Sequence, residues 1–169
     1  MATLAALESY ADNVSSNLIA LAGQILSPGT VPDFAALAHH AGLAYAITGL
    51  LKAFPIHAAR RQLYLPIELL QRHGARRADV AARRTTPELR AALAELRRAA
   101  CAHLQAARPL MATAAPAVIP ALLPLAPTGL ILTRMERSDY DPFVPVEVPQ
   151  WRRQWLIWRA AMRPARMFA

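Results

Sequence analysis

Apolar residues recur three or four positions apart through most of this chain, and that spacing restricts it to a helical fold. The N-terminal segment, residues 4–26, shows the pattern most clearly. Its predicted helix carries one apolar stripe, made of Leu7, Ala11, Val14, Leu18, Leu21 and Ile25. The Ser-Pro-Gly sequence at 27–29 ends that helix. Alanine and leucine dominate the composition and runs of strand-forming residues are rare, so the predicted fold class is all-α.

Two long helices follow from the same argument. The first starts near Pro32 and presents a stripe made of Phe34, Leu37, Ala41, Ala44 or Tyr45, Thr48 and Leu51. The second begins at Thr86-Pro87-Glu88, where a hydroxyl cap precedes a proline at the first helical position. It runs to about Arg108 and turns inward Leu89, Leu93, Leu96, Ala100, Leu104 and Ala107. Small residues in the first of these helices would let another helix approach closely: Ala38, Ala41, Gly42, Ala46 and Gly49.

Proline and glycine divide the middle of the chain. Pro55 is expected to end or kink the helix that contains it, leaving residues 54–65 irregular. A short helix follows at 67–73, and Gly74 caps it. Residues 75–85 then form a basic linker.

The C-terminal third is also predicted to be helical. A helix follows Pro116, residues 138–149 form a proline-rich loop, and a last helix carries Trp151, Trp155, Trp158 and Met162 on one face. Residues 114–132 have the length of a membrane span. Four prolines interrupt them, however, and each removes a backbone donor, so a buried helix with a proline-rich entry is favoured.

The formal net charge of +8 comes almost wholly from arginine, since Lys52 is the only lysine. It favours anionic partners such as phosphates or anionic lipid head groups. No helix-turn-helix, zinc or RNA-recognition signature accompanies the charge, so nucleic acid is not an expected partner. Cys101 is single, which excludes an intramolecular disulfide and fits a reducing compartment. No secretory signal pattern is visible at the N-terminus.

The segment that bears most on function is residues 46–66, AITGLLKAFPIHAARRQLYLP. It resembles the second aspartate-rich region of the squalene/phytoene synthases, in which an Asn-x-x-Arg-Asp-x-x-x-Asp pattern leads into a basic stretch and Tyr-Leu-Pro. Tyr64, Leu65 and Pro66 reproduce that ending. The likeness covers most of the chain but only the second half of a family domain. It implies a single domain over 1–169, a helical bundle resembling the second half of the isoprenoid synthase fold.

The metal-binding aspartates of that region are missing here. Counting back from Pro66, the family's two aspartate positions fall on Ala53 and His57, its asparagine on Gly49 and its arginine on Lys52. Two carboxylates four apart on a helix share a face, and in the family they hold Mg²⁺ ions that clamp the substrate diphosphate. Alanine offers no ligand and a lone imidazole is a poor ligand for Mg²⁺. We therefore expect no catalytic residue and no cofactor, with Mg²⁺ needed only if the chain is an active synthase.

A narrower likeness lies in the same segment. The pattern from Lys52 to His57, followed by Arg60 and Arg61, is similar to the family's branch of mitochondrial complex I assembly factors and their bacterial relatives. The loop at 139–143 and the Trp-rich last helix also look like that branch. This resemblance implies a non-catalytic assembly or scaffold factor for a membrane respiratory complex. The location would be cytoplasmic or peripheral at the bacterial inner membrane, or on the matrix side in a mitochondrion.

The sequence is also compatible with two other functions. The chain could be one subunit of a split prenyl-diphosphate transferase, with a partner chain supplying the N-terminal half-domain. It could also be an isoprenoid-binding module without chemistry. The candidate pocket or ligand-binding residues for either function are Lys52, His57, Arg60, Arg61 and Tyr64. The alternative for His57 is a loop residue that caps a helix or bonds the backbone, and we favour it because one histidine is not a site.

Two further groups are candidates for a membrane or partner surface. The first is Arg76, Arg77, Arg83 and Arg84, which could bind anionic lipid or form a solvated face. The second is Trp151, Trp155 and Trp158, which could anchor a peripheral protein in a membrane interface or face the core. A cation site at Asp139 and Asp141 is less favoured than an ordinary turn before Pro142. The histidines show no ligand-like spacing, and Cys101 is expected to be a small core residue.

Overall fold

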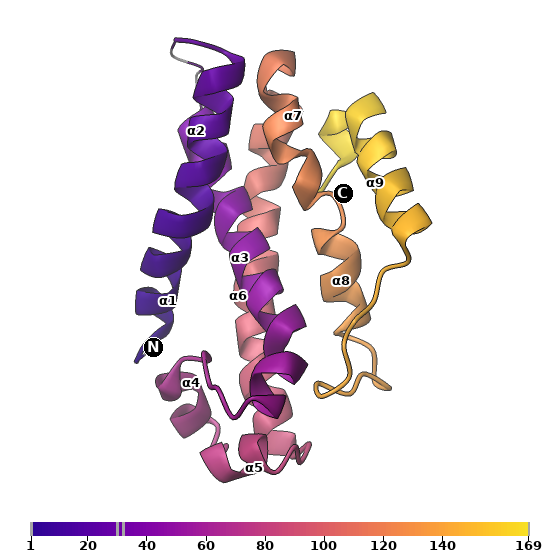
Figure 1. The fold of residues 1–169 in the computed structure, drawn as a ribbon. Coiled ribbons are helices and arrows are strands. Elements are labelled where there is room, and N and C mark those ends of the chain that lie inside the picture. Colours follow the sequence, from indigo (N-terminus) through magenta and orange to yellow (C-terminus); the bar gives the residue numbers. More distant parts are fainter. Residues whose placement is uncertain (1, 30, 32, 169) are drawn as a thin grey trace.

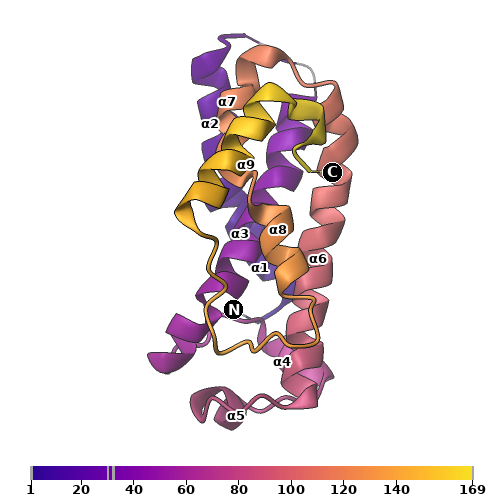
Figure 2. The same cartoon turned by 90° about the vertical axis from the view of Figure 1, so that its right-hand side faces the viewer.

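The computed structural model of the chain describes residues 2–29, 31 and 33–168. These residues form helices, turns and loops with no strand among them, which confirms the all-α class. Figure 1 shows the helices as a bundle in which α3 (Phe34–Ala59) and α6 (Pro87–Ala112) lie side by side at the centre. The N-terminal helix packs along one side of α3, and the C-terminal helices cover another side of the pair (Figures 1 and 2).

The N-terminal helix is continuous but irregular. It consists of α1 (Leu4–Ala11), a π turn η1 (Asp12–Ser16) and α2 (Asn17–Leu26). A π turn holds one residue more than the α-helical spacing requires, so it rotates everything beyond it about the helix axis. The single stripe predicted for this segment is split as a result. Leu7 and Ala11 are buried, whereas the members within and beyond the turn are exposed: Val14, Leu18, Leu21 and Ile25.

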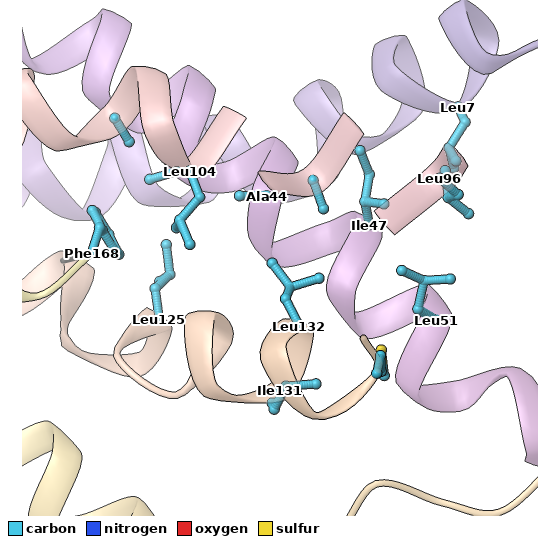
Figure 3. Packing of buried hydrophobic residues seen from close by; sticks show 14 of the residues in the cluster. Leu7, Ala44, Ile47, Leu51, Leu96, Leu104, Leu125, Ile131, Leu132 and Phe168 are labelled. Carbon is cyan, nitrogen blue, oxygen red and sulfur yellow. The ribbon is translucent and has the colours of Figure 1, made fainter. Parts of the chain in front are cut away.

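The core forms where the sequence places the two long helical stripes. Every inward residue predicted for α6 is buried, and α3 buries Ala44 rather than the alternative Tyr45. Figure 3 shows Ala44, Ile47 and Leu51 of α3 facing side chains that include Leu132 of α8. The predicted start at Pro32 lies outside the described residues. Gly42 permits the expected close approach, because a Cβ there would lie 2.5 Å from the Ser16 hydroxyl.

Two predictions about helix ends are wrong. Pro55 does not end α3, because the helix continues to Ala59 and only the residues from Arg60 onward are irregular. Phe54, Pro55 and Ala58 are all buried, so tertiary packing holds the last helical turns together despite the missing backbone donor. Similarly, α6 continues past Arg108 to Ala112.

The short helices behave largely as predicted. Helix α4 (Ile67–Arg72) is terminated by the turn at Gly74, whose φ of +71° suits glycine. The stretch predicted as a linker contains one further helical turn, α5 (Arg77–Ala81).

Prolines break the predicted helix after Pro116 into pieces. These are η2 (Pro116–Val118), α7 (Ile119–Leu122), η3 (Leu123–Leu125) and α8 (Thr128–Arg134). By length and composition, two segments could cross a membrane, namely Phe34–Ala59 and Pro116–Arg134. About half of the most apolar stretch of each segment is buried inside the bundle.

The loop after α8 leads to α9 (Gln150–Met162) and a final turn, η4 (Pro164–Arg166). Helix α9 lies against the outside of the bundle (Figure 2). It buries Ala160 and half-buries Leu156 and Ile157. The side that carries the tryptophans therefore faces away from the bundle.

Candidate functional site

The positions that correspond to the family's aspartates lie in the last two turns of α3. Ala53 and His57 are four residues apart and half-buried on one face, while Lys52 is exposed. Gly49 is also exposed, and a Cβ there would meet nothing within 4 Å. The expectation that Gly49 permits close helix packing is therefore wrong. Ala53 provides no donor atom and His57 only nitrogen, so this pair does not fit the oxygen-ligand preference of Mg²⁺.

His57 is the one titratable group of this pair. Its ring lies edge-on to the ring of Tyr64, with centroids 4.7 Å apart. Partial burial and the nearby positive charge of Arg60 both lower the pKa of His57, which favours a neutral imidazole. The main-chain carbonyl of His57 accepts hydrogen bonds from the amides of Arg60 at 3.1 Å and Gln62 at 2.8 Å. The backbone of His57 thus forms part of the turn that follows α3, and its ring contacts Tyr64.

The loop at 139–143 is tied to the same end of α3. Phe143 is buried with its ring centroid 5.3 Å from that of Phe54, the neighbour of Ala53. The Arg83 guanidinium donates to the Phe143 carbonyl at 2.9 Å. Asp141 accepts from the Phe143 amide at 3.0 Å and from the Thr85 hydroxyl at 3.1 Å. These bonds show that Asp141 stabilises a turn, which is the alternative to a cation site that the sequence favoured.

Part of the predicted basic surface has a structural role. Asp79 is buried, and its carboxylate accepts from Arg84 and, at 3.3 Å, from Arg76. The hydrogen bond from Arg84 is the main reason that the pKa of Asp79 lies below its usual value. Arg76 and Arg84 therefore compensate a buried charge inside their own loop, and Arg83 bonds the Phe143 carbonyl. All four candidates are exposed, and Arg77 lies at the start of α5.

The tryptophans of α9 form an open surface. Trp151, Trp155 and Trp158 are 48% to 70% exposed, and Met162 continues the row. The alternative in which this stripe faces the core is therefore wrong. The Arg159 guanidinium lies 5.0 Å from the centre of the Trp155 ring. We call this surface the tryptophan face; four further arginines lie in or just after α9: Arg152, Arg153, Arg163 and Arg166.

A cluster of histidines forms that the spacing in the sequence does not indicate. His39 and His40 on α3 meet His103 on α6, with ring centroids 5.0 to 6.2 Å apart. The Nδ1 atoms of His40 and His103 are 3.1 Å apart. Asp12 lies 2.6 Å from Nδ1 of His39, and Glu8 lies 3.6 Å from Nε2 of His103. Within the described residues, no group of three or more His, Cys, Asp or Glu is placed to hold a metal ion.

We expect this cluster to make folding stability depend on pH. Desolvation, followed by the charges of His103 and His39, lowers the pKa of His40 in the folded state. An unfolded His40 takes up a proton near pH 6.5, whereas the folded one resists it. Stability is therefore greatest above that pH and falls as the pH drops through it. An NMR titration should place the His40 midpoint below 6.5, and His103→Gln should raise it. A wild-type midpoint at or above 6.5 would contradict this expectation.

The chain is similar in sequence to proteins of one known family. Residues 1–159 match the sequence pattern of the squalene/phytoene synthase family. The chain is also similar to the protein named NADH dehydrogenase (ubiquinone) complex I, assembly factor 6. The Rattus norvegicus protein is 32% identical over 140 residues, which cover 82% of this chain and 41% of that protein. The Homo sapiens protein is 32% identical over 141 residues, with the same shares covered.

The extent of these matches decides what they establish. The family match spans nearly the whole chain, whereas the chain spans about two fifths of the length of the relatives. A match over that share of the relatives does not transfer their role as whole proteins. The match over residues 1–159 does identify the family: this chain belongs to the squalene/phytoene synthase family.

Proposed function

We propose that this protein is a non-catalytic member of its family that acts as an assembly or scaffold factor for a respiratory complex at a membrane. The observation that carries the proposal is the pair Ala53 and His57, which stands where the family's metal-binding aspartates belong. The half-site on α3 can neither hold Mg²⁺ through oxygen ligands nor clamp a diphosphate by that route. No step of prenyl transfer can be derived for it.

The names of the relatives support the proposed role in assembling a respiratory complex. Four mammalian proteins named as a complex I assembly factor match this chain at 30% to 32% identity. The ordered loop at 139–143 adds to this, because it packs Phe143 against Phe54 next to Ala53. A buried aromatic contact of this kind stabilises the end of α3.

The tryptophan face supports a peripheral location at a membrane. Tryptophan partitions into the interface between lipid head groups and acyl chains, and arginine attracts anionic lipids. Helix α9 combines the two, with exposed tryptophans on one side and arginines around them. We infer that α9 lies in the plane of the cytoplasmic or matrix surface of the membrane with its tryptophans inserted.

Mg²⁺-dependent diphosphate release from farnesyl and geranylgeranyl diphosphate tests the absence of catalysis. We expect the purified, helical chain to release no diphosphate above a no-enzyme control, while an active synthase of the family releases it under the same conditions. Release that requires Mg²⁺ and is lost in His57→Ala would overturn the proposal. Saturable binding of either diphosphate without release would instead favour the isoprenoid-binding module.

A further inference from the structure

Arginine side chains gather along one flank of α9. With about 100° between successive residues of a helix, Arg152, Arg159 and Arg163 fall on the same side. This side lies between the tryptophan face and the side that contacts the bundle. The opposite flank carries Gln154 and Ala161, which have no charge. Helix α9 therefore presents most of its positive charge along one edge of its exposed aromatic surface.

The turn after α9 adds a further arginine to this flank. The segment η4 packs back against α9 near the C-terminal end of the helix (Figure 2). Arg159, Arg163 and Arg166 then surround a small hollow. The floor of the hollow is apolar and consists of Ala126, Leu156, Ala160 and Met167. We call this feature the arginine hollow.

Within the described residues, no carboxylate side chain is paired with the arginines of the hollow. Residues 148–168 contain no Asp or Glu, and the ion pairs of the described chain do not involve Arg159, Arg163 or Arg166. All three side chains are exposed. Like charges around an apolar floor repel one another, and they are screened less than charges on an open surface. The arginine hollow therefore favours an anion.

The chemistry of the guanidinium group indicates which anion fits the hollow. Each guanidinium offers a planar fork of N–H donors that matches two oxygens of an anion. A carboxylate or a phosphodiester carries one negative charge on two oxygens. A phosphomonoester carries a charge of about −1.5 to −2 near neutral pH and presents three acceptor oxygens. Three arginines around one hollow thus suit a phosphomonoester best.

The position of the hollow indicates that this phosphate belongs to a lipid. The guanidinium of Arg159 lies 5.0 Å from the centre of the Trp155 ring, so the hollow directly borders the tryptophan face. If the tryptophans insert between lipid head groups and acyl chains, the flank beside them lies at the level of the lipid phosphates. A free phosphate or a phosphorylated peptide would make no use of the exposed rings.

We propose that the arginine hollow binds the phosphomonoester head group of an anionic lipid. Arg159, Arg163 and Arg166 hold the phosphate while the tryptophan face inserts beside it. This inference rests on the peripheral location of α9 proposed above. It adds that the protein recognises a membrane by the type of its head groups and not by surface charge alone.

Vesicles of matched charge test the proposal. Phosphatidylcholine vesicles that contain phosphatidic acid or phosphatidylglycerol are adjusted to the same zeta potential, so general electrostatic attraction is equal for both. We expect the full chain to bind the phosphatidic acid vesicles at least about tenfold more tightly. Arg163→Lys with Arg166→Lys keeps the charge but removes two forks, so this variant should bind both kinds of vesicle alike.

A second pair of substitutions is the matched control. Arg108→Lys with Arg153→Lys changes two arginines that are also exposed but do not line the hollow. This variant should keep the preference for phosphatidic acid. Inorganic phosphate, titrated into the chain without vesicles and followed by calorimetry, should bind only in the millimolar range, because it cannot engage the tryptophans.

The possible results separate this inference from the peripheral location on which it rests. Equal binding of the wild type to both kinds of vesicle overturns the inference alone and leaves an acidic protein segment as the occupant of the hollow. Absence of binding to any vesicle overturns the peripheral location as well. A preference that survives Arg163→Lys with Arg166→Lys, or micromolar binding of inorganic phosphate by itself, overturns the assignment of the hollow to a lipid.

Discussion

Gly42→Ala is expected to destabilise the fold by about 2–3 kcal/mol, although alanine is the better helix former. The added Cβ would lie 2.5 Å from the Ser16 hydroxyl, 2.6 Å from its Cα and 2.7 Å from its amide nitrogen. Two of these atoms belong to the backbone of the π turn, so no side-chain rotation can relieve the overlap. The N-terminal helix must move away from α3, and the buried contacts on both sides of Gly42 are weakened.

Gly49→Ala in the same helix is the matched control. A Cβ at Gly49 meets nothing within 4 Å, so only the helix propensity changes and stability should rise by about 0.5–1 kcal/mol. Chemical unfolding of the two variants measures both effects. Hydrogen exchange should also quicken in α1 and α2 of Gly42→Ala. If Gly42→Ala were as stable as Gly49→Ala, the close packing of the π turn on α3 would be wrong.

Substitution of the tryptophan face is expected to abolish binding to anionic membranes. Replacing Trp151, Trp155 and Trp158 by alanine removes three exposed aromatic side chains without changing the charge. If each ring contributes about 1.5–3 kcal/mol when buried in the interface, the triple variant should partition more weakly by at least a factor of about a thousand. Co-sedimentation with phosphatidylcholine vesicles containing phosphatidylglycerol measures this loss.

Two comparisons make the membrane experiment specific. Tyr45→Ala with Tyr64→Ala removes aromatic rings that are also exposed but lie outside α9, so it should bind like the wild type. Vesicles of phosphatidylcholine alone should bind the wild type more weakly, because the arginines of α9 then meet no anionic lipid. If the triple variant bound anionic vesicles as well as the wild type, the tryptophan face would instead be a surface for a protein partner.

Several features of this protein follow from the sequence because they depend on neighbouring residues. The stripes of α3 and α6 are buried as their spacing predicts, since a period near 3.6 places those residues on one face of a helix. The Thr86 hydroxyl accepts from the Leu89 amide at 3.2 Å, as a hydroxyl cap should. Gly74 ends α4 with a positive φ. The family and the replacement of its aspartates by Ala53 and His57 could also be read from one local motif, and the family match over residues 1–159 agrees with that prediction.

Other features could be decided only by packing between distant residues. Pro55 stays inside α3 because buried neighbours hold the turn, and the histidine cluster exists because α3 brings His40 beside His103. The sequence alone determined which helices form and which faces are apolar. Only the tertiary structure decided that the π turn points Leu18 outward and that α9 keeps its tryptophans exposed, because an apolar stripe packs equally well against a core, a membrane or another chain.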